Sequence, residues 1–178
     1  NVRVTFVDGT DPAKRFGVWH AADIFASFSD NIQETFGLVI VEAMACGLPV
    51  VASDWNGYRD LVVQGKTGFL ASTVMVSGAT TDSTTRLLFG EINYDHYLAE
   101  VSQSTTVDLG TTVAAFVRLF EDEALRAQMG KEGRARALSE LTWAAVVRRY
   151  ERLWAELHRH RQSVEPTLGS TLGCYPPP

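Results

Sequence analysis

Two glutamates, Glu34 and Glu42, are the residues of this sequence whose types and positions could bind or act on a polar ligand. Glu34 lies in a polar loop, whereas Glu42 lies within the apolar segment 37–46. A helix over 37–46 would have apolar side chains on every side, so we expect it to be buried, with no solvated face. Glu42 would be buried with it unless it lines a cleft. A buried carboxylate costs several kcal/mol unless polar groups satisfy it, and the two hydroxyls of a ribose match one carboxylate well. The helical neighbours of Glu42 are Leu38, Val39, Ala45 and Cys46.

The start of this helix offers a second polar feature beside Glu42. The first N–H groups of a helix have no partner within the helix, and the helix dipole is positive at that end, so the start can bind a phosphate. Gly37 would let an anion approach the backbone closely. We therefore expect phosphates at the N–H groups of Leu38 and Val39, a ribose beside Glu42, and Glu34 facing the group beyond the phosphates. Two other interpretations remain open: Glu34 as a solvated loop residue, and Glu42 as the partner of an arginine elsewhere.

The elements around these residues indicate a parallel α/β fold. Segments 24–28, 49–53 and 67–71 are short and apolar throughout, and helical segments separate them. Strands of this kind are typical of a parallel sheet covered on both faces, here a Rossmann-like sheet with flanking helices. The β-branched pattern of 2–7 predicts a further strand, and Asp11-Pro12 begins a helix that runs to about residue 22.

The second half of the chain is predicted to be mainly helical. Residues 72–85 are rich in Ser, Thr and Gly, and with 86–106 they form an excursion from the sheet, with one short helix near 94–101. Helix resumes at Asp108. Thr142 is a plausible N-cap for a closing helix over about 142–162, which we expect to be packed by one apolar face. We expect a domain over 1–162 and a disordered tail or linker over 163–178.

Composition excludes several classes of function. With 178 residues the chain has the length of one domain. Its formal net charge of −5 disfavours binding to nucleic acid or anionic lipid over a broad surface. No segment is long and apolar enough to form a transmembrane segment. Cys46 lies in an apolar run and Cys174 in a Pro-rich tail, so we expect no disulfide between them and a cytoplasmic location.

The block around the two glutamates closely resembles the donor-binding motif of family-4 retaining glycosyltransferases. It has the form Glu34-x7-Glu42, followed by Ala-Met-Ala-Cys-Gly-Leu-Pro-Val-Val-Ala-Ser. The resemblance implies the GT-B fold, in which two Rossmann-like domains face a cleft. It covers most of 1–162, except about 72–106. It continues through Asp54-Trp-Asn-Gly57, residues 64–70, Met129-Gly130, Gly133-Arg134 and the closing helix.

The family's site residues can be carried over to the matching positions of this sequence. Glu34 would contact hydroxyls of the donor sugar near the reacting face, as the catalytic residue, and Glu42 would hold the ribose of the nucleotide sugar. The resemblance implies transfer with retention of configuration and without a metal or other cofactor. Four backbone N–H groups would complete the site, those of Phe36 and Gly37 at sugar hydroxyls and those of Leu38 and Val39 at the β-phosphate.

The sequence also departs from the family pattern. Thr35 stands where many family members have Gly, and Asn56-Gly57 stands where Gly-Gly is more usual. Asp60 likewise replaces a more usual Glu. These differences leave the identity of the sugar open. The strands and the Arg- and Lys-bearing loop that begin the family's donor domain are not found, nor is the acceptor-binding domain before them. We therefore expect the C-terminal, donor-side domain of a GT-B enzyme, incomplete at its N-terminus and inactive when isolated.

Two further hypotheses belong to other functional classes. One is a non-catalytic domain that binds nucleotide sugar or packs against a partner, and the two glutamates do not exclude it. The other is a sugar-nucleotide epimerase on the same fold, which the intact pair Glu34 and Glu42 disfavours. A glycoside hydrolase fits poorly, because its two carboxylates must flank the scissile bond.

Overall fold

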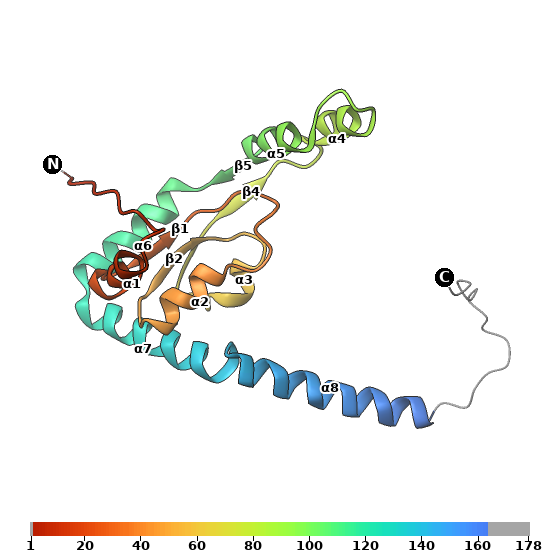
Figure 1. Ribbon diagram of the computed structural model, residues 1–178. Coiled ribbons are helices and arrows are strands. Elements are labelled where there is room, and N and C mark those ends of the chain that lie inside the picture. Colours follow the sequence, from red (N-terminus) through yellow and green to blue (C-terminus); the bar gives the residue numbers. More distant parts are fainter. Residues whose placement is uncertain (1, 164–178) are drawn as a thin grey trace. The chain divides into compact units, whose positions relative to one another are not determined.

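A three-stranded parallel sheet forms the centre of the protein, which a computed structural model describes over residues 2–163 (Figure 1). The strands β1 (Phe25–Ser27), β2 (Val50–Ser53) and β3 (Gly68–Ala71) lie side by side in chain order. Phe25 pairs with Val50, and Val50 pairs with Gly68, both in parallel register. The predicted α/β class and parallel sheet are confirmed.

Helices cover both faces of this sheet, which explains its apolar strands. α2 (Leu38–Ala45) connects β1 to β2, and α3 (Tyr58–Leu61) connects β2 to β3. α6 (Leu109–Glu121) packs against β2 and β3 on the face opposite α2 and α3 (Figure 1). Every residue of β2 is buried, because alternate side chains face the two helical layers. The core on the α6 side consists of Val51, Phe69, Ala115, Leu119 and Met129.

The N-terminal segment differs from its predicted structure. Residues 2–7 form no strand, and their apolar side chains are exposed, with Val2 at 93% and Phe6 at 95%. A β-branched pattern favours extended backbone, but a strand also needs a hydrogen-bonded neighbour. Within the described residues, 2–7 pair with no strand. The next element, α1 (Pro12–Ala21), begins as predicted, with the Asp11 carboxylate accepting a hydrogen bond from the Ala13 N–H at 3.0 Å.

Residues 72–108, called the insertion below, fold into a small unit of their own beyond β3 (Figure 1). β4 (Thr73–Met75) and β5 (Thr105–Val107) form an antiparallel ribbon, and α4 (Thr81–Leu88) and α5 (Tyr94–Gln103) lie between them in the chain. The helix predicted near 94–101 is present as α5. Residues 72–85, predicted only as part of an excursion from the sheet, contain β4 and the start of α4.

α7 (Glu123–Glu140) follows α6, and a second unit, residues 140–163, contains α8 (Trp143–Ser163). The Thr142 hydroxyl accepts a hydrogen bond from the Ala145 N–H at 3.3 Å, as expected of an N-cap. Ser163, assigned to the predicted tail, ends α8, and the rest of that tail, with Cys174, lies outside the described residues. None of the described helices combines the length and apolar character that crossing a membrane requires.

Candidate donor-binding site

Gly37 forms the turn that begins α2, as the sequence predicts. Its φ is +91°, in the left-handed region that glycine adopts most easily. A Cβ atom placed on Gly37 would lie 2.5 Å from the Tyr58 ring. Both the backbone conformation and the neighbouring ring therefore require glycine at this helix start.

The first amides of α2 are available to a ligand. The N–H groups of Ile40 and Val41 donate to the Gly37 carbonyl, at 3.0 and 3.4 Å. Among residues 2–163, no acceptor lies within hydrogen-bonding distance of the N–H groups of Gly37, Leu38 and Val39. No side chain caps this helix start. Three neighbouring donors at the positive end of a helix can together bind a phosphate.

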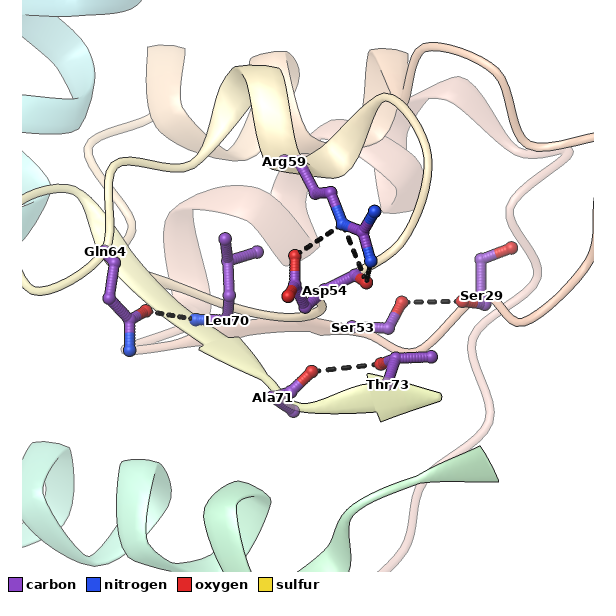
Figure 2. A network of polar contacts seen from close by, with 8 residues as sticks. All are labelled: Ser29, Ser53, Asp54, Arg59, Gln64, Leu70, Ala71 and Thr73. Carbon is purple, nitrogen blue, oxygen red and sulfur yellow. Dashed lines mark hydrogen bonds and ion pairs between the residues drawn. The ribbon is translucent and has the colours of Figure 1, made fainter. Parts of the chain in front are cut away.

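The loop before α2 is held by the segment that follows β2. The Ser53 hydroxyl donates to the Ser29 carbonyl at 2.6 Å (Figure 2), and the indole N–H of Trp55 donates to the Asn31 carbonyl at 3.0 Å. Gly57 lies against the loop so closely that a Cβ there would be 2.3 Å from the Thr35 carbonyl oxygen. The Asp54-Trp-Asn-Gly57 motif thus acts as a support for the loop that carries Glu34.

Glu34 is partly buried, and each of its carboxylate oxygens has a long hydrogen-bond contact. Oε1 accepts from the Phe36 N–H at 3.4 Å, and Oε2 accepts from the Tyr58 hydroxyl at 3.4 Å. Tyr58 also lies 2.8 Å from the Ser27 hydroxyl at the end of β1. Burial is the main cause that raises the pKa of Tyr58, the Ser27 contact opposes it, and the charge and hydrogen bond of Glu34 raise the pKa further.

Sequence reasoning did not identify Tyr58. It stands as the one aromatic side chain in the short segment 58–62, directly after the turn that follows β2. In a parallel sheet the carboxyl ends of neighbouring strands lie at the same edge, and this placement could have indicated a contact with the loop after β1. Trp55 in the same turn is buried, with its indole N–H bound to the loop.

Glu42 is exposed, so the prediction that it is buried is wrong. α2 buries Ile40, Ala43 and Met44, whereas Leu38 and Val39 remain 68% and 39% exposed. A helix lying on a sheet buries the side chains that face the sheet, and an apolar composition alone does not cover the others. The cost of burying a charge therefore no longer supports a ribose at Glu42. What remains is that Glu42 shares an exposed face of α2 with Leu38 and Val39, next to the available amides.

α7 secures the far ends of the two connecting helices. Arg134 donates to the Ala45 carbonyl at the end of α2, and Arg136 donates to the carbonyls of Leu61 and Asp60, at 2.8 and 2.7 Å. These cations lie where the helix dipole is negative, which stabilises both helix ends. Gly130 permits the approach, since a Cβ there would overlap the Gly47 carbonyl. The Met129-Gly130 and Gly133-Arg134 motifs therefore hold α2 in place rather than contribute to its open end.

A hollow of about 540 Å³ lies elsewhere, between β3 and α6. Asp54, Gln64 and Arg118 line it, and none of the residues predicted to bind the donor does so. Its polar groups are largely engaged within the protein: Arg59 binds Asp54, and the Gln64 carbonyl oxygen accepts from the Leu70 N–H at 2.6 Å (Figure 2). The candidate site is therefore the start of α2 and not this hollow.

Within residues 2–163, no group of three or more His, Cys, Asp or Glu side chains is placed to hold a metal ion.

Comparison with known proteins identifies the family of this sequence. The sequence profile described as glycosyl transferases group 1 matches residues 2–100. A phosphatidyl-myo-inositol mannosyltransferase of Mycobacterium leprae is 31% identical over 123 residues, which are 68% of this chain and 32% of that protein. A D-inositol 3-phosphate glycosyltransferase of Corynebacterium glutamicum is 33% identical over 127 residues, 67% of this chain and 28% of that protein.

A solved structure supports the GT-B fold that the family resemblance implies. A sucrose-phosphate synthase from Thermosynechococcus elongatus superposes with a TM-score of 0.52 at 25% identity, over 88% of this chain and 30% of that protein. The α/β architecture is that of GT-B glycosyltransferases. The chain thus spans about a third of the length of the proteins that it matches.

Proposed function

The chain belongs to the glycosyl transferases group 1 family, and we propose that it forms the part of a glycosyltransferase that binds a nucleotide-activated sugar. The observation that carries this proposal is the start of α2. Three backbone N–H groups without an acceptor among the described residues stand beside a partly buried carboxylate, that of Glu34. A diphosphate at the amides and a sugar at the carboxylate would use both features.

The assignment of individual contacts follows the order of groups in such a donor. The β-phosphate would bind the N–H groups of Leu38 and Val39, and sugar hydroxyls would bind Glu34 and the N–H groups of Phe36 and Gly37. The Phe36 N–H would share its proton between the sugar and its long contact with Glu34 Oε1. The ribose would lie beside Glu42, on the exposed face of α2. The resemblance to the family's Glu-x7-Glu motif supports these roles, and the shared exposed face of Leu38, Val39 and Glu42 supports the last of them.

The proposed reaction is transfer of the sugar with retention of anomeric configuration and without a bound metal. As the bond between the sugar and the diphosphate breaks, negative charge grows on the departing phosphate oxygens. Fixed N–H donors and the positive end of α2 stabilise that charge, a contribution that needs no metal ion. The two relatives named above are transferases, which favours transfer over epimerisation.

Acceptor binding is proposed to involve residues outside this chain. The matched relatives are about three times as long as the matched region, and the family resemblance places the acceptor in the facing domain. We therefore expect no sugar transfer by the 178 residues alone. Turnover of a nucleotide sugar by the purified chain would contradict this part of the proposal.

Calorimetric titration tests the donor site directly. UDP, GDP and ADP, each with and without an attached sugar, are titrated into wild type, Glu42→Ala and the control Glu121→Ala, which removes an exposed carboxylate from α6. We expect one nucleotide series to bind wild type and the control equally, and Glu42→Ala to bind it about tenfold more weakly, as for a lost hydrogen bond to a charged group. Equal affinity of all three proteins would remove the ribose role of Glu42, and no binding of any nucleotide would refute the proposed function.

A further inference from the structure

The Tyr58 side chain connects the three elements that meet at the proposed donor site. It is the first residue of α3 and is only 1% exposed. Its ring lies against Gly37 at the start of α2, and its hydroxyl lies 2.8 Å from the Ser27 hydroxyl at the end of β1. The same hydroxyl reaches Oε2 of Glu34 at 3.4 Å. One buried side chain thus contacts a strand end, the loop of Glu34 and the helix start.

The direction of these hydrogen bonds follows from counting protons. A tyrosine hydroxyl has one proton to donate, and the ionised Glu34 carboxylate can only accept. Because Tyr58 donates to Glu34, the Ser27 hydroxyl must donate to Tyr58. Burial and the nearby Glu34 charge raise the pKa of Tyr58, so its proton stays in place near neutral pH. The result is a directed chain from Ser27 through Tyr58 to Glu34.

We propose that Tyr58 is a positioning residue that orients Glu34 toward the sugar of the bound donor. The inference rests on the proposed function, since it assumes that Glu34 contacts that sugar. Tyr58 is too deeply buried to touch a ligand itself, and therefore acts through the carboxylate. With Oε2 held by Tyr58 and Oε1 held by the Phe36 N–H, the carboxylate plane has one preferred orientation. Both contacts are long, so a hydroxyl of the sugar would meet an acceptor that is oriented but not saturated.

Tyr58→Phe tests this role, because it keeps the ring against Gly37 and removes only the hydroxyl. The probes are UDP, GDP and ADP and the sugar nucleotides UDP-glucose, GDP-mannose and ADP-glucose, titrated into the full chain. We expect the affinity for the nucleoside diphosphate to stay within about twofold, and the affinity for the matching sugar nucleotide to fall about tenfold. Tyr97→Phe, on α5 in the insertion, is the matched control and should change neither affinity.

A double-mutant cycle with Glu34→Gln separates positioning from a general structural effect. If Tyr58 acts through Glu34, adding Tyr58→Phe to Glu34→Gln causes no further loss of sugar-nucleotide affinity. If Tyr58→Phe instead weakens diphosphate and sugar nucleotide by the same factor, Tyr58 only supports the fold; this inference fails while the proposed function stands. If wild type binds none of the six probes, the proposed function fails, and the role of Tyr58 fails with it.

The contact itself can be measured without any ligand. The Tyr58 hydroxyl is followed through a pH titration by NMR of tyrosine labelled with ¹³C at Cζ, in wild type and in Glu34→Gln. Removing the Glu34 charge should move the Tyr58 titration to lower pH, because that charge raises the pKa of Tyr58. An unchanged titration would show that the two groups do not interact, and would overturn the inference whatever the binding data show.

Discussion

The start of α2 and the insertion use their polar groups in opposite ways. At the start of α2 the turn residue is Gly37, no side chain caps the helix, and three N–H groups have no acceptor among the described residues. In the insertion, Asn93 caps α5, with its side-chain oxygen 2.8 Å from the His96 nitrogen, and Asp108 caps α6, 2.8 Å from the Thr111 nitrogen. The starts of α5 and α6 are therefore closed by side chains, whereas the start of α2, like that of α4, has no side-chain cap.

The carboxylate of Glu100 in the insertion has short hydrogen-bond partners. Arg86 on α4 contacts Oε1 of Glu100 on α5 at 2.9 Å, and the Ser83 hydroxyl donates to Oε2 of the same carboxylate at 2.6 Å. Both oxygens of Glu100 are therefore engaged within the insertion. Glu34 also has both oxygens in contact, but each at 3.4 Å. The comparison suggests that polar groups with short partners hold the fold, and that loosely held ones are available to a ligand.

The largest effect on stability is expected from adding a methyl group to Gly37, in the turn that begins α2. Gly37→Ala combines a positive φ with a Cβ 2.5 Å from the Tyr58 ring, and should lower the free energy of unfolding by about 3 kcal/mol, as judged by urea denaturation. Gly17→Ala on α1 is the control, since a Cβ there meets nothing within 4 Å and should stabilise the helix by up to about 1 kcal/mol. Equal midpoints for Gly37→Ala and wild type would show that the turn is not built as described.

Binding of a nucleotide at the start of α2 should stabilise the protein whether or not the cap of α6 is present. A nucleoside diphosphate at about 100 times its Kd should raise the free energy of unfolding by about 2.7 kcal/mol. The same increment is expected in Asp108→Ala, because the cap of α6 takes no part in binding. If the nucleotide no longer stabilises Asp108→Ala, the ligand binds at the start of α6 and not at the start of α2.

Removing the side-chain cap of α6 should lower the stability of the fold and leave nucleotide binding unchanged. Asp108→Ala leaves the Thr111 N–H without its carboxylate acceptor and should cost about 1 kcal/mol of unfolding free energy, read from the urea midpoint. Asp108→Asn keeps an acceptor oxygen at the same place and should recover most of that loss. If both variants lose equally, the charge of Asp108 matters more than its hydrogen bond.

The smallest expected effect concerns the pH dependence of the insertion. The Ser83 hydrogen bond is the main cause that lowers the pKa of Glu100 from its ordinary 4.5, with Arg86 and His96 contributing. A carboxyl group with a lowered pKa in the folded state contributes stability above 4.5, which is lost as the pH falls through the folded pKa. Glu100→Gln should therefore show a flatter loss of stability than wild type when urea midpoints are compared from neutral pH down to below 4. Parallel curves for the two proteins would contradict the lowered pKa.

Local sequence determined most of the architecture around the site. The continuous apolar strands, Gly37 at the helix start and the Asp11-Pro12 and Thr142 caps all act over a few residues, so their patterns predict the elements that form. The Glu-x7-Glu block likewise predicted a glycosyltransferase, because its residue types are specific at fixed spacing, and the match to the glycosyl transferases group 1 family confirms this. These features depend on backbone propensity and on side chains that reach only their near neighbours.

Only the tertiary structure decided which of these side chains meet solvent or one another. Residues 2–7 have the composition of a strand but pair with no strand among residues 2–163. Glu42 lies among apolar helix neighbours yet is exposed, since the sheet covers only the other side of α2. Tyr58 reaches Glu34 across 24 positions of sequence, a contact created when β1 and β2 are paired. Burial and long-range hydrogen bonds depend on how elements pack, and that arrangement is not encoded in the periodicity of any single element.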